Sequence, residues 1–182
     1  MTDMAEFPPE PEGWLPPQEL EYIRAHLPML YVDIVPVRVD ENGSIQEVGL
    51  VLRAYDDAMV RALVSGRVLY HERIREALVR HVEKDLGPLA LPRIGPSPEP
   101  FMIAEYFPTK GVGPFHDSRQ HAVSLAFVVP VDGECEARQE ALDIVWLTPE
   151  EAASEEIGAE MHGGQDIILR RGFASYEAEA GS

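Results

Sequence analysis

The chain has 182 residues, of which 45% are hydrophobic and 26% are charged, a composition typical of one globular domain rather than of a disordered chain. Its formal net charge of −17 argues against binding to a nucleic acid polymer. No apolar run approaches the roughly 20 residues of a membrane helix, and the N-terminus shows no signal-peptide pattern. The single cysteine excludes an internal disulfide and a cysteine-based zinc site. We therefore expect a cytoplasmic protein without a membrane partner.

The acidic residues are concentrated at the two ends of the chain. Residues 1–22 carry six acidic and no basic side chains, and residues 132–182 carry 13 acidic and three basic ones. Residues 1–17 also contain five prolines, which fix φ and remove hydrogen-bond donors. We expect a Pro-rich acidic tail with a short helix over 1–27, a folded domain over 28–176 and a C-terminal tail over 177–182.

Hydrophobic periodicity predicts the elements of the domain. Alternating residues indicate strands at 30–39 and 45–54, and the Asn42-Gly43 turn between them is typical of a hairpin. Helical spacing of apolar residues predicts a helix over 72–86, which Gly87-Pro88 ends. The order of elements indicates an α/β fold with one mixed sheet covered by helices. The remaining predictions are strands at 101–107, 121–131 (central) and 141–147, a helix that begins after the N-cap Thr148, a helix at 163–174, and an ambiguous segment at 56–64.

The segment from Gly66 to Gly87 carries the functional prediction. It has Glu at 72, Arg at 80 and an aliphatic residue at 82. This pattern resembles the Nudix box of the Nudix hydrolase superfamily, which reads Gly, five residues, Glu, seven residues, Arg-Glu, an aliphatic residue, any residue, Glu-Glu, any residue, Gly. The two strands before it, and the later Trp146 strand with its short helix, also resemble that family. The resemblance covers about residues 28–175.

The resemblance implies a Nudix-type α/β/α sandwich that hydrolyses a nucleoside diphosphate linked to another moiety. In such enzymes the box carboxylates hold Mg²⁺ or Mn²⁺ against the diphosphate, and the metal polarises the phosphoryl oxygens for attack by water. Glu72 and Arg80 match the two residues that brace the metal-binding glutamates. We take Glu72, Arg80 and Asp85 as catalytic candidates.

Most of the metal ligands of the box are replaced in this chain. Three positions that the family fills with Glu hold His81, Lys84 and Asp85, so Asp85 is the metal-ligand candidate that the box retains. Glu83 cannot replace a lost carboxylate, because it lies about 160° around the helix from His81 and from Asp85. The charge of Lys84 repels Mg²⁺ but suits a phosphate. An imidazole such as His81 is a ligand that Mg²⁺ does not favour.

Several further residues are candidates, each with a purely structural alternative. Substrate phosphates could contact Arg53, Arg67, Lys84 or His81, but His81 could equally be a core histidine and the others solvated surface residues. The remaining candidates are a transition-metal cluster of His116, Asp117 and His121, a replacement carboxylate at Glu105, and base stacking by Trp14 or Tyr106.

Two functions follow from these residues. The first is a Nudix-type hydrolase, metal-assisted and impaired to the extent that its carboxylates are missing. The second is a non-catalytic Nudix-like module that binds a nucleotide or a protein, with Lys84 in place of metal charge. The number of carboxylates that converge on Asp85 should discriminate between them. The expected partner is a small nucleotide diphosphate, and a homodimer is left open.

Overall fold

The fold is known from a computed structural model that describes residues 13–55 and 57–180. The first twelve residues of the predicted N-terminal tail, 1–12, and the last two residues of the chain lie outside the described part. Along the described chain, no helix is long and apolar enough to cross a membrane. The elements, in chain order, are α1 (Pro17–His26), β1 (Met29–Val39), β2 (Ile45–Tyr55), β3 (Ala58–Ala62), β4 (Val64–Arg67), α2 (Ile74–Leu86), β5 (Met102–Phe107), β6 (Phe115–His116), β7 (Ala122–Pro130), β8 (Asp143–Leu147), α3 (Pro149–Ala152), α4 (Glu155–Glu160) and α5 (Gln165–Ala180).

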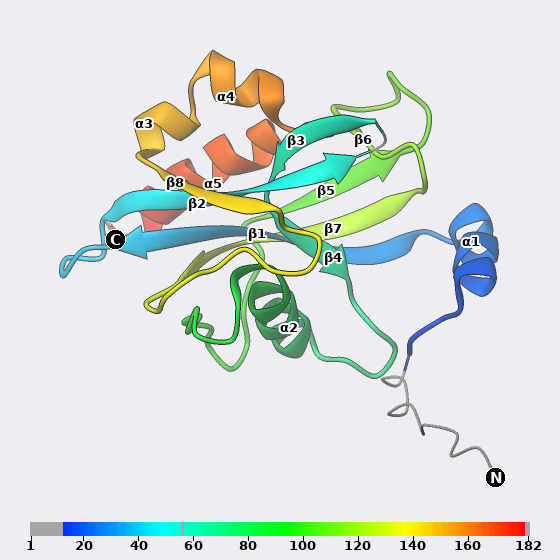
Figure 1. The fold of residues 1–182 in the computed structure, drawn as a ribbon, viewed down its shortest axis with the longest axis horizontal. Helices are drawn as coiled ribbons and strands as arrows, with labels where there is room; N and C mark the ends of the chain where they lie inside the picture. The colour runs from blue at the N-terminus through cyan, green and yellow to red at the C-terminus, as the bar shows by residue number, and fades with distance from the viewer. Residues whose placement is uncertain (1–12, 56, 181–182) are drawn as a thin grey trace, which may run out of the picture.

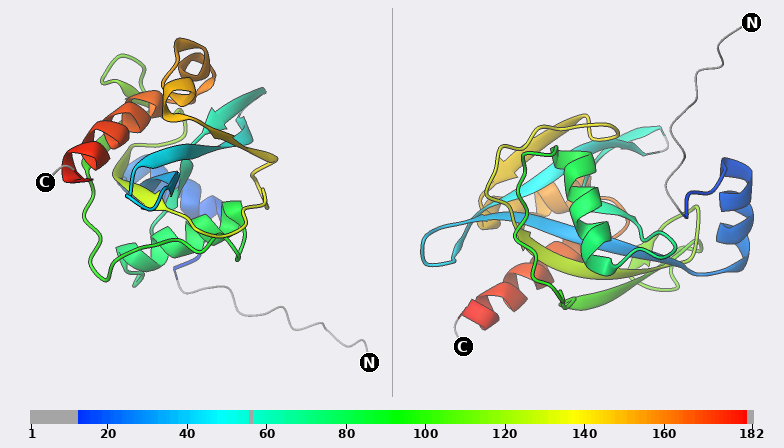
Figure 2. Two further views of the ribbon diagram at one scale, coloured as in Figure 1. Left: turned by 90° about the vertical axis from the view of Figure 1, so that its left-hand side faces the viewer. Right: turned by 90° about the horizontal axis from the view of Figure 1, so that it is seen from below.

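One mixed sheet lies between two layers of helices, which confirms the predicted α/β/α sandwich (Figures 1 and 2). Helix α2 covers one face, whereas α3, α4 and α5 cover the other. Because side chains alternate along a strand, β1 serves both cores: Val32 and Ile34 belong to the α2 side, and Val35 and Val37 to the α5 side. All four side chains are fully buried.

The apolar strand β7 lies inside the sheet, as predicted. It pairs in parallel with β1 from Met29–Ala122 to Val37–Pro130, and its other edge pairs antiparallel with β5. Eight strands therefore form a single sheet in which β1 and β7 are the central pair.

The sheet opens between β1 and β2. These strands pair only where 37–39 meets 45–48. Beyond that point β2 pairs with β3 and β1 pairs with β4, so β1 and β2 separate. The fork exposes inward-facing side chains of β2, β3 and β4 to a common space.

The structure adds three short strands and shifts one helix. The ambiguous segment at 56–64 forms β3 and ends at the first residue of β4, and the segment before β7, where the sequence predicts no strand, contains β6. The last helix begins at Gln165 instead of residue 163, because Gly163 and Gly164 adopt φ values of 61° and 89°, which an α-helix does not allow. It continues to Ala180, past the expected end of the domain at residue 176.

Candidate functional site

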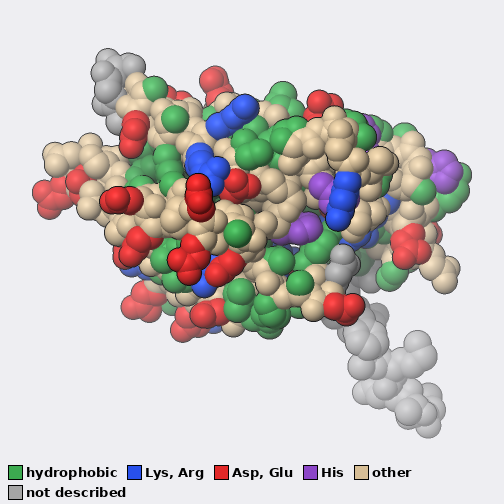
Figure 3. Space-filling model, turned by 90° about the horizontal axis from the view of Figure 1, so that it is seen from above, with side chains coloured by type: hydrophobic (Ala, Val, Ile, Leu, Met, Phe, Trp, Pro, Cys, Tyr) green, Lys and Arg blue, Asp and Glu red, His purple; other side chains and the backbone are tan. Residues whose placement is uncertain are grey.

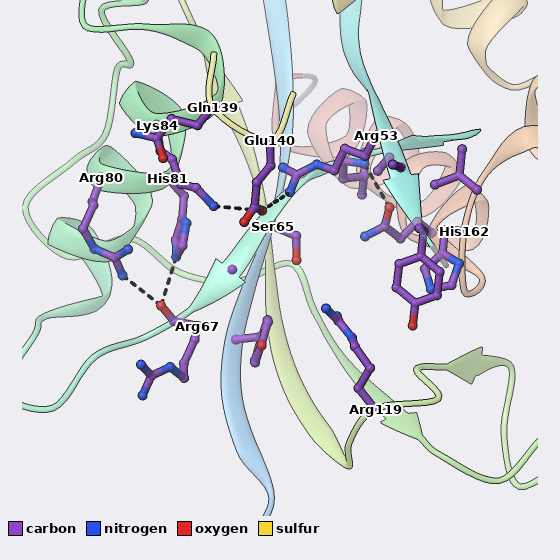
Figure 4. Close-up of a pocket in the computed structure, with 18 of the residues that line it drawn as sticks. Arg53, Ser65, Arg67, Arg80, His81, Lys84, Arg119, Gln139, Glu140 and His162 are labelled. Atoms are coloured by element: carbon purple, nitrogen blue, oxygen red, sulfur yellow. Dashed lines mark hydrogen bonds and ion pairs between the residues drawn. The ribbon is translucent and has the colours of Figure 1, made fainter. Parts of the chain in front are cut away.

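A cleft of about 970 Å³ lies in the fork of the sheet, beside α2 (Figure 4). Its walls come from β2, β3, β4, α1, α2, the segment around Trp14 and the loops that precede β7, β8 and α5. Two acidic side chains, Glu83 and Glu140, line it. Six of the 15 Lys and Arg residues of the chain also line it, namely Arg24, Arg53, Arg67, Arg80, Lys84 and Arg119.

Glu72 and Arg80 form a bidentate ion pair at the turn from β4 into α2. Arg80 Nε donates to Glu72 Oε1 at 2.6 Å, and Arg80 Nη2 donates to Glu72 Oε2 at 2.8 Å. Arg80 Nη2 also donates to the Arg67 carbonyl, while Glu72 accepts from the Leu69 amide. Partial burial raises the pKa of Glu72, but these hydrogen bonds outweigh it and leave the pKa below its ordinary value. The pair fixes the β4–α2 connection and directs Arg80 along the cleft.

His81 is a buried and neutral member of the cleft wall. It is 4% exposed, and burial lowers its pKa to about 4. Its Nε2 lies 3.0 Å from the Arg67 carbonyl; because a carbonyl only accepts, Nε2 carries the proton. The ring lies directly against Gly66, where a Cβ atom would overlap Cε1 and Nδ1 of His81.

Asp85 contacts a guanidinium in this structure. Its side chain is fully buried and forms an ion pair with Arg53 Nη2. Burial raises the pKa of Asp85, and the charges of Arg53 and Lys84 oppose that rise. Glu140 joins the same group, because its Oε2 lies 3.2 Å from Lys84 Nζ and 3.8 Å from Arg53 Nη1. Two carboxylates and two cations thus alternate between α2, β2 and the segment before β8.

These residues do not fit a divalent metal. Within residues 13–55 and 57–180, no three His, Cys, Asp or Glu side chains lie together in a way that could hold a metal ion. Asp85, the carboxylate that the box retains, has no exposed surface and contacts Arg53 instead. Mg²⁺ requires several accessible oxygen ligands, whereas the carboxylates here are paired with the ammonium of Lys84 and the guanidinium of Arg53.

The opposite wall is organised by Asp117. Its carboxylate accepts two hydrogen bonds from the Arg119 guanidinium at 2.9 Å, one from Tyr55 Oη at 3.0 Å and one from Gln120 Nε2 at 2.9 Å. Burial raises the pKa of Asp117, but its donors prevail and lower it to about 2. Gln120 in turn accepts from Arg24 Nε at 2.9 Å, which ties α1 to this wall.

The residues considered as a transition-metal cluster take separate roles. Asp117 holds Arg119, whereas the ring of His121 stacks on Phe107 with centroids 4.7 Å apart. His116 lies in β6 and lines a smaller cavity of about 60 Å³ that adjoins the cleft.

Three other candidates are also placed by the structure. Trp14 lines the cleft and is 53% exposed. Tyr106 is buried, its Oη donates to Asp33 Oδ2 at 3.0 Å, and it lines the smaller cavity instead of the main cleft. Glu105 is exposed on β5 and lines neither cavity.

Several residues of the cleft carry little signal in the sequence. Arg119 lies two positions after Asp117 and belongs to no motif, although an Arg close to a buried Asp is a reasonable candidate for an oriented cation. Arg24 and Glu140 lie in segments without a motif, and only the fold brings them to α2 and β4. Asp33, at the centre of β1, is 1% exposed and accepts from Tyr106 and from Gln165 Nε2 at 3.2 Å. Desolvation raises the pKa of Asp33.

Comparison with known proteins identifies the family and the fold of this chain. The model of the family described as "Domain of unknown function (DUF4916)" matches residues 10–178. A crystal structure from Jonesia denitrificans, described as a possible asymmetric diadenosine tetraphosphate hydrolase, is 61% identical, with a TM-score of 0.81; the match covers 84% of this chain and 96% of that one. No curated protein matches this sequence.

More distant structures share the fold. A diadenosine tetraphosphate hydrolase from Caenorhabditis elegans, solved as a binary complex, is 16% identical with a TM-score of 0.59 over 83% of this chain and 98% of that one. The Nudix domain of NrtR from Shewanella oneidensis, solved with ADP-ribose, is 14% identical with a TM-score of 0.56 over 86% and 90% of the two chains. The chain therefore belongs to the DUF4916 domain family and, by its fold and the register of its box, to the Nudix superfamily.

Proposed function

We propose that the cleft binds a nucleoside diphosphate linked to another moiety. The observation that carries the proposal is the gathering of six Lys and Arg side chains in one cleft of a chain whose net charge is −17. Acidic side chains are spread over much of the face shown in Figure 3, whereas histidine and basic side chains lie next to each other on its right-hand half. A concentration of cations against an acidic surface favours a polyanionic ligand of small size.

The cations occupy two walls that a linked diphosphate can span. Arg80 and Lys84 lie on the α2 side, Arg119 lies on the opposite side, and Arg53 lies between them (Figure 4). Guanidinium groups bind phosphate oxygens in pairs of parallel hydrogen bonds. The exposed ring of Trp14 offers an aromatic face to a base.

Hydrolysis of the bound compound is the second candidate. It is favoured by the intact Glu72–Arg80 pair and by the 61% identical structure that is described as a possible diadenosine tetraphosphate hydrolase. Turnover of ADP-ribose or diadenosine tetraphosphate with Mg²⁺ present, followed by chromatography, tests it. Product formation that Glu72→Gln abolishes would support an enzyme; binding without turnover would support a module that senses or carries the nucleotide.

Fluorescence of Trp14 measures binding directly. The chain has two tryptophans, and Trp146 packs under Arg38, with the guanidinium carbon 4.4 Å from the ring centroid. In a Trp146→Phe background, titration with ADP-ribose should give a saturable change in the emission of Trp14. Adding Arg119→Gln should weaken binding about tenfold or more, because it removes a charge-assisted hydrogen-bond donor.

The matched control for Arg119→Gln is Arg93→Gln. Arg93 is 53% exposed and pairs with Asp132 on the surface, so this variant should bind ADP-ribose like the parent. An absence of any saturable change, or equal affinities of the Arg119 and Arg93 variants, would contradict the proposal.

A further inference from the structure

Four charged side chains on the α2 side of the cleft form an alternating group, which we term the charge quartet: Asp85, Arg53, Glu140 and Lys84. Arg53 contacts Asp85 and lies 3.8 Å from Glu140, and Lys84 Nζ lies 3.2 Å from Glu140. The quartet carries two positive and two negative charges, so its formal charge is zero. It is drawn from α2, β2 and the segment before β8.

The quartet stands where the resemblance to Nudix hydrolases places a metal. In the box of that family, carboxylates at the positions of His81, Lys84 and Asp85 hold a divalent cation. Here the single positive charges of Arg53 and Lys84 together balance the two carboxylates of the quartet, as the double charge of one divalent ion would. A guanidinium and an ammonium supply fixed hydrogen-bond donors to phosphate as well as charge.

Access to Asp85 is closed to a metal from the cleft. The Asp85 side chain has no exposed surface, while the Arg53 side chain that contacts it is 16% exposed and lines the cleft. A cation that approached Asp85 would have to displace the guanidinium and to pass the ammonium of Lys84, which is 24% exposed. Both groups repel a divalent ion, whereas both attract a phosphate oxygen.

We infer that Arg53, together with Lys84, takes the place of the divalent cation in this cleft, so that a diphosphate group binds here without metal. The inference rests on the proposed function for the identity of the ligand. The proposed function concerns the nucleotide, whereas this inference concerns the source of the positive charge that binds its phosphates.

Calorimetric titration of the full chain with ADP-ribose and with inorganic pyrophosphate, each in EDTA and in Mg²⁺, tests the inference. We expect each probe to bind in EDTA at least as tightly as in Mg²⁺, because Mg²⁺ forms a complex with the phosphate groups of the free probe. The double variant Arg53→Gln/Asp85→Asn replaces a neutral ion pair by a neutral amide pair and so avoids an unpaired buried charge. It should bind both probes about tenfold or more weakly in both buffers, whereas Arg93→Gln should leave binding unchanged.

A second measurement uses Mn²⁺ alone. Electron paramagnetic resonance counts the Mn²⁺ ions bound by the wild type and by Asp85→Asn. Ions held loosely by the acidic surface are the same in both proteins and cancel when the two counts are subtracted. We expect equal counts. One additional ion in the wild type, or binding of pyrophosphate that needs Mg²⁺, would overturn the inference.

The outcomes separate the two proposals. Binding of pyrophosphate in EDTA without any binding of ADP-ribose would uphold the metal-free anion site and contradict the proposed nucleotide ligand. Failure of pyrophosphate to bind in EDTA would overturn the inference itself, whatever ADP-ribose does. Arg53→Lys gives a further check on the role of the guanidinium, because it keeps the charge but loses the fork of donors. Its affinity for both probes should lie between those of the wild type and of the double variant.

Discussion

Gly66 of the box leaves room for a neighbouring side chain and does not form the tight turn that a glycine before a helix suggests. A glycine before a helix predicts a tight turn that needs a positive φ, but Gly66 lies within β4 and is not among the positive-φ glycines. The reason for glycine here is space, since the ring of His81 occupies the position of a side chain. The pair Gly66–His81 therefore behaves as one packing unit between β4 and α2.

Gly66→Ala should destabilise the protein by about 2 kcal/mol, the usual cost of overpacking a closed site. The added Cβ would overlap the His81 ring, which cannot move without breaking its hydrogen bond to the Arg67 carbonyl. Urea unfolding measures the change in the free energy of unfolding.

Two further variants test whether the effect of Gly66→Ala comes from the overlap with the His81 ring. Gly95→Ala should have little effect, because a Cβ there meets nothing within 4 Å. In the double variant Gly66→Ala/His81→Ala the two changes should be non-additive, since removing the ring makes room for the new methyl group. Additive effects would show that the two residues do not compete for the same space.

At the scale of elements, the loop before β7 connects three separate parts of the fold. Asp117 binds Arg119 within the loop and Tyr55 at the end of β2, and its neighbour Gln120 accepts from Arg24 of α1. The cleft wall is therefore held by a network of side chains and not by strand pairing alone. Such a network orients a cation before the ligand arrives.

Asp117→Asn should weaken the binding of ADP-ribose about tenfold, because Arg119 loses a bidentate partner and its orientation. Asp132→Asn is the matched control: Asp132 pairs with Arg93 at 3.0 Å, but both side chains are 53% exposed. Calorimetry at a temperature where both variants are folded gives the comparison. Equal affinities would mean that Arg119 needs no carboxylate to reach the ligand.

At the scale of the whole molecule, local patterns predicted the scaffold better than the site. Alternation located β1, β2 and β7, and helical spacing located α2, because the burial of each repeats along its own sequence. The cleft combines segments that are distant in sequence, and no local pattern predicts that Arg53 forms an ion pair with Asp85. The sequence indicates that the metal ligands are depleted and puts Lys84 in place of the metal charge; in the structure Arg53 forms the ion pair with Asp85, and Lys84 pairs with Glu140.

The acid stability of the whole chain should reflect two buried groups in separate pH ranges. His81 has a folded pKa of about 4 against an ordinary 6.5, so the unfolded chain binds a proton that the folded protein does not. Its contribution to stability is complete above pH 6.5 and is lost as the pH falls towards 4. Asp117 has a folded pKa of about 2 against an ordinary 3.8; its contribution is present above pH 3.8 and is lost as the pH falls towards 2.

Urea unfolding at pH 7 and 4.5 isolates the first of these contributions. Between these pH values the wild type should lose about 2 kcal/mol more of its free energy of unfolding than His81→Gln, whose amide can still donate to the Arg67 carbonyl but does not titrate. Asp117→Asn should follow the wild type over this range and differ from it only below about pH 4. If His81→Gln and the wild type lose the same free energy between pH 7 and 4.5, then His81 titrates in the folded protein, which would require water to reach the ring between Gly66 and α2.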